Sequence, residues 1–149
     1  GKAKYDIVHI GLNSRLDTIQ AAILIAKLKI FETEIKARNR LSNKYAKALK
    51  GYVKIPVLSD GDRSAWAQYT IQTEDRDYLQ SSLADKGVPT AVYYPRPMHL
   101  QTAYKAYGNG IGSLPVTEEL CKSVLSLPMH PYMDDGVVDY VCDAIRSSF

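Results

Sequence analysis

The chain has 149 residues and a formal net charge of +3, from 19 basic and 16 acidic side chains that are interspersed. This length suits one compact domain spanning residues 1–149, and the mild charge gives no electrostatic case for a nucleic-acid partner. No apolar run is long enough to cross a bilayer or to serve as a signal peptide, so we expect a cytoplasmic protein with no membrane contact. Two cysteines and three separated histidines follow no metal-ligand spacing, and we expect no metal site.

The first third of the sequence predicts one long helix, straight or kinked, that ends at Gly51. Ser14 followed by Asp17 resembles a capping box, which places the start of the helix between Asn13 and Arg15. A helix of this length is expected to span between two bodies or to line an interface. The predicted apolar face runs at three- and four-residue steps, with a polar gap at Thr33 and Glu34, through Leu16, Ile19, Ile23, Ala26, Ile30, Ala37, Leu41, Tyr45 and Ala48.

The remaining elements are short and mixed. In chain order the pattern predicts an extended piece at 53–57, a strand at 66–73, a helix at 74–86 and a strand at 90–94. A short helix through Tyr104, a helix at 116–123, a buried strand at 124–127 and a last helix capped by Asp134 or Asp135 follow. A few short strands covered by helices make an α+β fold, built as a two-layer sandwich after the long helix.

Two proline-stiffened loops follow predicted strands and carry histidine with tyrosine, at 93–99 and 127–132. In the first loop we favour a binding site formed by Tyr94, Arg96 and His99. In the second, the simpler interpretation is preferred, in which His130 finishes a strand. The loop 107–112 contains Gly-Asn-Gly-Ile-Gly but matches no phosphate-binding fingerprint, and it is predicted to be a flexible turn.

Asn13 and Arg15 form a polar cluster at the start of the long helix. The carboxamide of Asn13 and the planar, permanently charged guanidinium of Arg15 suit phosphate or carboxylate groups. The alternative is a capped helix with no other role, and this segment alone favours that alternative.

Three segments together carry a family resemblance. They are Gly11-x-Asn-x-Arg-Leu-Asp-x-Ile-Gln-Ala-Ala22, Val88-Pro-Thr-x-Val-Tyr-Tyr-Pro-x-Pro-Met-His-Leu-Gln101 and Leu125-Ser-Leu-Pro-Met-His-Pro-Tyr132. In this order they resemble the C-terminal (small) domain of the DegT/DnrJ/StrS family. The resemblance implies the aspartate aminotransferase fold and a pyridoxal-phosphate-dependent aminotransferase acting on nucleotide-linked keto sugars. Within the family, the sequence is most similar to enzymes that aminate a UDP-linked 3-keto sugar acid for bacterial surface polysaccharide such as lipopolysaccharide.

The resemblance also implies a role for each matched residue. Asn13 would reach the cofactor phosphate of the neighbouring subunit in a homodimer, and Arg15 would approach the nucleotide sugar. Tyr93 and Tyr94 would line the sugar or nucleotide pocket, although many relatives carry histidine in place of Tyr93. Arg96 and His99 would contribute to the same pocket.

In the family, the Schiff-base lysine and most of the phosphate cradle lie upstream of these motifs, in a large cofactor-binding domain that this sequence lacks. We therefore expect that this chain alone binds no pyridoxal phosphate and does not transaminate. We also expect residues 1–15 to be disordered or packed against another copy. A stand-alone dimerisation or ligand-binding module is the alternative function.

Overall fold

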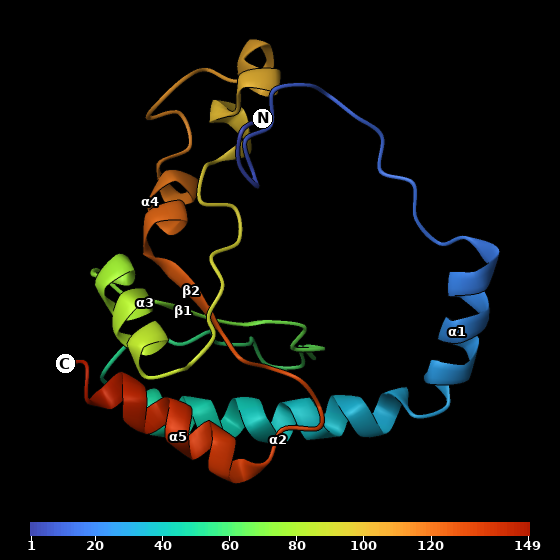
Figure 1. The fold of residues 1–149 in the computed structure, drawn as a ribbon, viewed down its shortest axis with the longest axis vertical. Coiled ribbons are helices and arrows are strands. Elements are labelled where there is room, and N and C mark those ends of the chain that lie inside the picture. Colours follow the sequence, from blue (N-terminus) through green and yellow to red (C-terminus); the bar gives the residue numbers. More distant parts are fainter.

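The computed structural model describes residues 1–149, and Figure 1 shows a body of short helices and strands from which one helix stands apart. The helices are α1 (Thr18–Leu28), α2 (Phe31–Leu49), α3 (Arg76–Asp85), α4 (Pro115–Ser123) and α5 (Asp135–Arg146). The strands are β1 (Tyr69–Gln72) and β2 (Val124–Leu127). Two 3₁₀ helices, η1 (Met98–Leu100) and η2 (Thr102–Tyr107), complete the elements. The predicted α+β class is confirmed in this form, as a small antiparallel sheet with several helices.

The sheet is antiparallel and pairs Tyr69 with Leu127 at one end and Gln72 with Val124 at the other. Single bridges from Lys54 to Gln72 and from Ala91 to Ser126 extend it on both sides. The prediction of a strand at 90–94 is therefore wrong, except for the single bridge at Ala91. Prolines on either side of the segment lack the N–H groups that a longer ladder needs.

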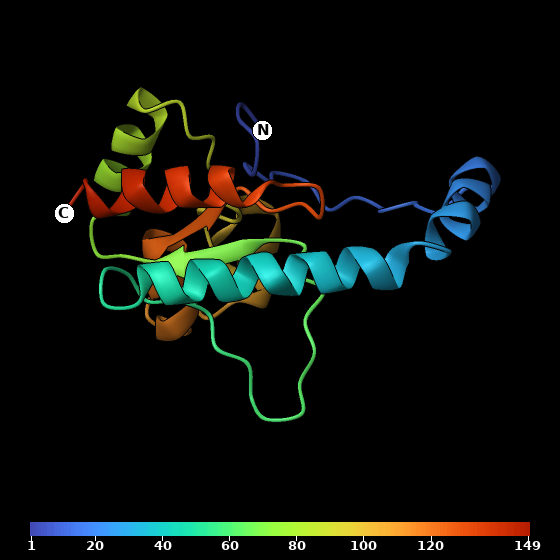
Figure 2. The same cartoon turned by 90° about the horizontal axis from the view of Figure 1, so that it is seen from below.

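The core lies between the sheet and a pair of helices, α2 and α5, which lie side by side in both ribbon views (Figures 1 and 2). Each of these helices buries one face, as the apolar periodicity of the sequence predicts. The tyrosines of the core stack, with the ring centroids of Tyr45 and Tyr69 4.9 Å apart. The largest buried apolar side chains are Leu41, Tyr45 and Leu49 from α2, Tyr69, Ile71 and Leu125 from the sheet, Leu79 and Leu83 from α3, and Val138 and Ile145 from α5.

The predicted long helix is in fact two helices separated by a turn at Lys29 and Ile30. The N–H groups of these two residues bond to carbonyls three residues back rather than four, which tightens the turn and ends α1. The predicted start is also wrong, because Asp17 is itself the N-cap and its carboxylate accepts a hydrogen bond from the N–H of Gln20 at 2.8 Å.

α1 buries no residue, although its sequence is the most apolar of the five helices. Figures 1 and 2 show why: an extended arm leads from the N-terminal region away from the body, and α1 lies at its far end. The predicted apolar face of α1 is consequently open, with Ile19 75% exposed and Ile23 56% exposed. No helix combines the length and apolar character that crossing a bilayer requires.

Candidate functional site

Tyr93 lies half-buried beside a surface hollow of about 260 Å³ at one edge of the sheet. The wall that contains Tyr93 continues through Thr90 and Ala91, and the facing wall includes Gln68 and Met129. These walls come from the segment before β1, the exit from β2 and the bridge at Ala91. The structure therefore brings the predicted strand ends together around one hollow that contains a predicted site residue.

Arg38 of α2 bonds to two segments beside this hollow, the one before β1 and the one after β2. Its Nη1 donates to the carbonyl oxygen of Trp66 at 2.8 Å and to that of Met129 at 3.4 Å. Trp66 has a φ of 44°, a left-handed conformation that non-glycine residues rarely adopt. The indole Nε1 of Trp66 also donates to Asn39 Oδ1 at 3.0 Å. These contacts from α2 stabilise the strained residue and fix the segment that leads into β1.

Tyr94 points to a different neighbour from Tyr93. Its ring lies 5.6 Å from that of Tyr5, centroid to centroid, at an interplanar angle of 50°. Gln101, which is only 1% exposed, connects the two segments. Its Nε2 donates to the carbonyl oxygens of Tyr5 at 2.9 Å and Arg96 at 3.3 Å, and its Oε1 accepts from the N–H of Ile7 at 3.2 Å. The N-terminal segment is therefore packed against the loop after Ala91.

His99 acts with Glu118 to hold the glycine-rich loop. His99 Nε2 lies 3.1 Å from Glu118 Oε1, while its buried Nδ1 has no partner. The same carboxylate accepts hydrogen bonds from the N–H groups of Gly112 at 2.9 Å and Leu114 at 3.3 Å. The Gly112 N–H, and then His99, lower the pKa of Glu118 because they stabilise its charged form. A Cβ at Gly108 would lie 2.7 Å from the carbonyl oxygen of His99. This packing holds the predicted flexible turn in one conformation.

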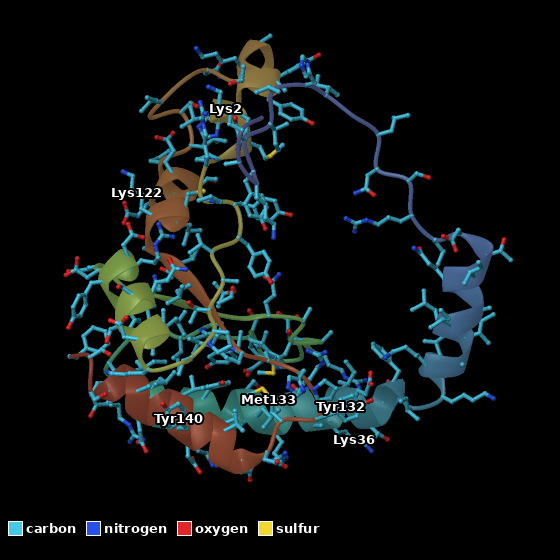
Figure 3. The ribbon with its side chains drawn as sticks, in the orientation of Figure 1. Lys2, Lys36, Lys122, Tyr132, Met133 and Tyr140 are labelled. Carbon is cyan, nitrogen blue, oxygen red and sulfur yellow. The ribbon has the colours of Figure 1, made fainter.

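The second proline-rich loop is bound to α2 rather than open for a ligand. His130 Nδ1 accepts from the N–H of Tyr132 at 3.3 Å, and the hydroxyl of Tyr132 donates to Glu34. Figure 3 shows Tyr132 and Met133 lying against α2. This arrangement agrees with the simpler interpretation of His130 as a residue that finishes a strand.

Asn13 and Arg15 lie on the extended arm, both exposed, and neither takes part in a hydrogen bond or ion pair. Figure 1 shows that this arm is separated from the loop that carries Tyr93 and Tyr94. The structure thus divides the predicted site into two groups. Asn13 and Arg15 therefore lie apart from the other predicted site residues.

A larger hollow, about 580 Å³, lies elsewhere and contains none of the predicted site residues. It is bounded by the turn after α2, the end of β1 and the C-terminal Phe149. Cys121 and Cys142 are both buried free thiols, on α4 and α5 as predicted.

Comparison with known proteins identifies the family of this chain. The profile described as the DegT/DnrJ/EryC1/StrS aminotransferase family matches residues 1–146. This chain belongs to that family. The predicted resemblance is thereby confirmed.

The relatives are sugar aminotransferases. Over 97% of its length the chain is 41% identical to the UDP-2-acetamido-2-deoxy-3-oxo-D-glucuronate aminotransferase of Pseudomonas aeruginosa, covering 40% of that protein. It is 36% identical to a dTDP-3-amino-3,4,6-trideoxy-alpha-D-glucose transaminase of Streptomyces venezuelae, covering 97% of this chain and 39% of that one. The crystal structure of a family member from Brucella abortus superposes with a TM-score of 0.83 at 52% identity, covering 99% of this chain and 39% of that one.

The chain therefore spans about two fifths of the length of these relatives. That proportion agrees with a partial domain of the family. The sequence motifs predict which part it is, the C-terminal one.

Proposed function

We propose that this chain is the C-terminal, small-domain part of a pyridoxal-phosphate-dependent aminotransferase that acts on a UDP-linked keto sugar. The observation that carries the proposal is the 41% identity to the P. aeruginosa enzyme, which extends over 97% of the chain. That enzyme is named for a UDP-linked 3-oxo sugar acid. A bacterial surface polysaccharide precursor is the product class that the motif resemblance implies. The chain contributes residues to a shared site and does not transaminate alone.

The exposed arm supports a site shared between two subunits. Asn13 and Arg15 have no partner within the chain, and the arm stands away from the body (Figure 1). In a homodimer, Asn13 would donate to the cofactor phosphate of the neighbouring subunit, and Arg15 would form a bidentate contact with the nucleotide sugar. Bound pyridoxal phosphate supplies the electron sink for amino transfer, with a lysine from the large domain.

The loop after Ala91 would form the other wall of the substrate pocket. Tyr93 lines the hollow at the sheet edge, and Tyr94 and Arg96 are exposed beside it. His99 is 9% exposed at its side chain and bonded to Glu118, so its contribution is to hold this loop in position. Prolines at 95 and 97 reduce the freedom that the loop would lose when substrate binds.

A chimera tests this proposal. The matching segment of the P. aeruginosa aminotransferase is replaced by this chain, and amino transfer to its UDP-linked 3-oxo sugar is followed by mass spectrometry with a panel of amino acids as donors. We expect activity from the chimera and none from the isolated chain. A well-folded chimera that binds pyridoxal phosphate but transfers no amino group would contradict the proposal.

Mixing two inactive chimeras tests the sharing of the site. One carries Asn13→Ala, and the other lacks the cofactor lysine of its large domain. If the arm reaches the neighbouring subunit, the mixed dimer contains one complete site and recovers activity. If each arm serves its own subunit, mixing restores nothing.

The open apolar face of α1 favours a second function, that of a dimerisation module without catalysis. Ile23 and Leu24 are 56% and 48% exposed, and a contiguous apolar face of this kind marks a contact surface. Light scattering distinguishes the outcomes: a dimer that Ile23→Glu converts to monomer supports a contact between two copies. A strict monomer at high concentration rejects it.

A further inference from the structure

The antiparallel sheet ends beside the hollow that contains Tyr93. Its last register pair at this end joins Tyr69 to Leu127. Beyond that pair the two segments continue along the hollow with no backbone hydrogen bond between them, and Pro128 has no N–H to donate. The ladder of the sheet therefore does not hold this side of the hollow together.

Arg38 of α2 joins the two segments where the ladder has ended. Its Nη1 donates to the carbonyl oxygen of Trp66, before β1, at 2.8 Å, and to that of Met129, after β2, at 3.4 Å. Met129 lines the hollow, and Trp66 directly precedes another lining residue, Ala67. One nitrogen atom thus connects two parts of the hollow that are far apart in sequence.

The guanidinium of Arg38 bonds to main chain rather than to carboxylates. Arg38 is half-buried, and it takes part in none of the ion pairs of the chain. A cation that leaves water needs hydrogen bonds in compensation, and bonds from a charged donor are roughly twice as strong as neutral ones. The two carbonyl oxygens are therefore what stabilises the charge of Arg38 in this position.

One of the two contacts falls on a strained residue. Trp66 has a φ of 44° and is only 9% exposed. A left-handed backbone at a residue with a side chain persists only where the surrounding contacts impose it. If the carbonyl group of Trp66 were released, the backbone would relax and would move Ala67 and Gln68 with it. The shape of the hollow beside Tyr93 consequently depends on Arg38.

We propose that Arg38 is a positioning residue that sets the shape of the hollow around Tyr93 and thereby the affinity for the sugar substrate. The inference rests on the proposed function, in which Tyr93 lines the substrate pocket. Arg38 lies outside the three segments that carry the family resemblance and does not line the hollow, so it acts through the main chain alone. Its loss weakens substrate binding and leaves the amino-transfer step unchanged.

The kinetics of the chimera with the P. aeruginosa large domain test this role at saturating amino donor. We expect Arg38→Met to raise the KM for the UDP-linked 3-oxo sugar about tenfold, which corresponds to about 1.4 kcal/mol, while kcat stays within about twofold. Arg38→Lys should raise the KM less, because both bonds come from one nitrogen and an ammonium also carries several donors on one nitrogen.

Lys86→Met is the matched control. Lys86 Nζ also donates to a main-chain oxygen, that of Ala144 at 2.9 Å, but Lys86 does not line the hollow or contact the segments beside it. This variant loses a cation bonded to main chain, as Arg38→Met does, and should leave the KM unchanged.

Trp66 is the only tryptophan of the chain, so its fluorescence reports the same change without catalysis. In the full chain, Arg38→Met should shift the emission of Trp66 to longer wavelengths and increase its quenching by acrylamide, because the relaxed backbone exposes the indole. Lys86→Met should alter neither quantity.

The inference is overturned if Arg38→Met leaves the fluorescence of Trp66 unchanged, or if Lys86→Met raises the KM as much as Arg38→Met. A fall in kcat at constant KM, or an Arg38→Lys variant as impaired as Arg38→Met, also overturns it. An active chimera whose KM does not respond to Arg38 rejects this role alone. A chimera that is inactive with the unaltered chain rejects the proposed function, together with the role that rests on it.

Discussion

Replacing Gln101 by Met should release the N-terminal segment from the body while leaving the rest of the fold in place. Met matches the length and the unbranched shape of Gln but cannot make its three hydrogen bonds to the main chain of Tyr5, Ile7 and Arg96. A net value of about 1 kcal/mol for each bond predicts a loss of about 3 kcal/mol in the stability of this contact. At 1.4 kcal/mol per factor of ten, the local opening equilibrium shifts about 100-fold.

Amide hydrogen exchange measures this shift directly. The N–H groups of Ile7 and Ala103 are bonded across the contact, to Gln101 and to Ile7 respectively, so both should exchange about 100-fold faster in Gln101→Met. The N–H of Cys142, within α5, should be unaffected. Gln101→Glu is a second variant, since a carboxylate can accept from Ile7 but cannot donate to the two carbonyl oxygens.

Unchanged exchange at Ile7 and Ala103 in both variants would refute the reasoning, because it would show that Gln101 does not hold this segment. Equal acceleration at Cys142 would also refute it. In that case Gln101 would support the whole fold, and the N-terminal segment would not open separately from the rest of the chain.

Three other predictions follow from the packing. Gly108→Ala should destabilise the chain by about 1–3 kcal/mol in denaturant unfolding, because its Cβ would meet a main-chain carbonyl at 2.7 Å, whereas Gly136→Ala, in open space within α5, should be neutral or stabilising. Tyr45→Phe should cost about 1–2 kcal/mol, since its hydroxyl donates to a main-chain carbonyl at 3.0 Å, but Tyr69→Phe should cost nothing because that buried hydroxyl has no partner. Calorimetry would contradict this pair if both melting temperatures fell alike. The pKa of Glu118 lies below its ordinary value of 4.5, so its stabilising effect is complete above that pH and is lost on acidification through the lower folded pKa. The stability of Glu118→Gln should therefore fall less than that of the parent between neutral and acidic pH.

Local periodicity was sufficient to predict much of the fold. The buried faces of α2 and α5, the short strand β2 and the apolar alternation at Tyr69 and Ile71 all appear as expected. Each depends on apolar residues that meet the same core, so the pattern in the sequence and the burial in the structure have one cause.

The same periodicity could not predict the position of the extended arm or the exposure of α1. An apolar stripe predicts a buried face but cannot say which molecule or domain buries it, and α1 has no partner in this chain. The turn at Lys29 and Ile30 carries no glycine or proline that would signal a break in the helix. The expectation that residues 1–15 would be disordered or packed on another copy holds only in part, since Tyr5 and Ile7 are bound to Gln101.

The sequence could name candidate site residues but not their arrangement, and their roles stay predictions. Tyr94, Arg96 and His99 could be selected because they lie on a proline-stiffened loop after a predicted strand, and Tyr93 could be selected only from the family resemblance. Sequence reasoning missed Tyr5 and the supporting residues Arg38, Gln101 and Glu118. Gln101 lies inside a motif and Glu118 in the first turn of a helix, but hydrogen bonds between segments distant in sequence leave no periodic signal.

Amino transfer by the chimera with the P. aeruginosa large domain tests the central claim most directly. If this chain is the small-domain part of a sugar aminotransferase, the chimera converts the UDP-linked 3-oxo sugar to its amino sugar, and Arg15→Ala within the chimera reduces that activity. A chimera that folds, dimerises and binds pyridoxal phosphate, yet forms no amino sugar with any amino acid donor, would contradict the account.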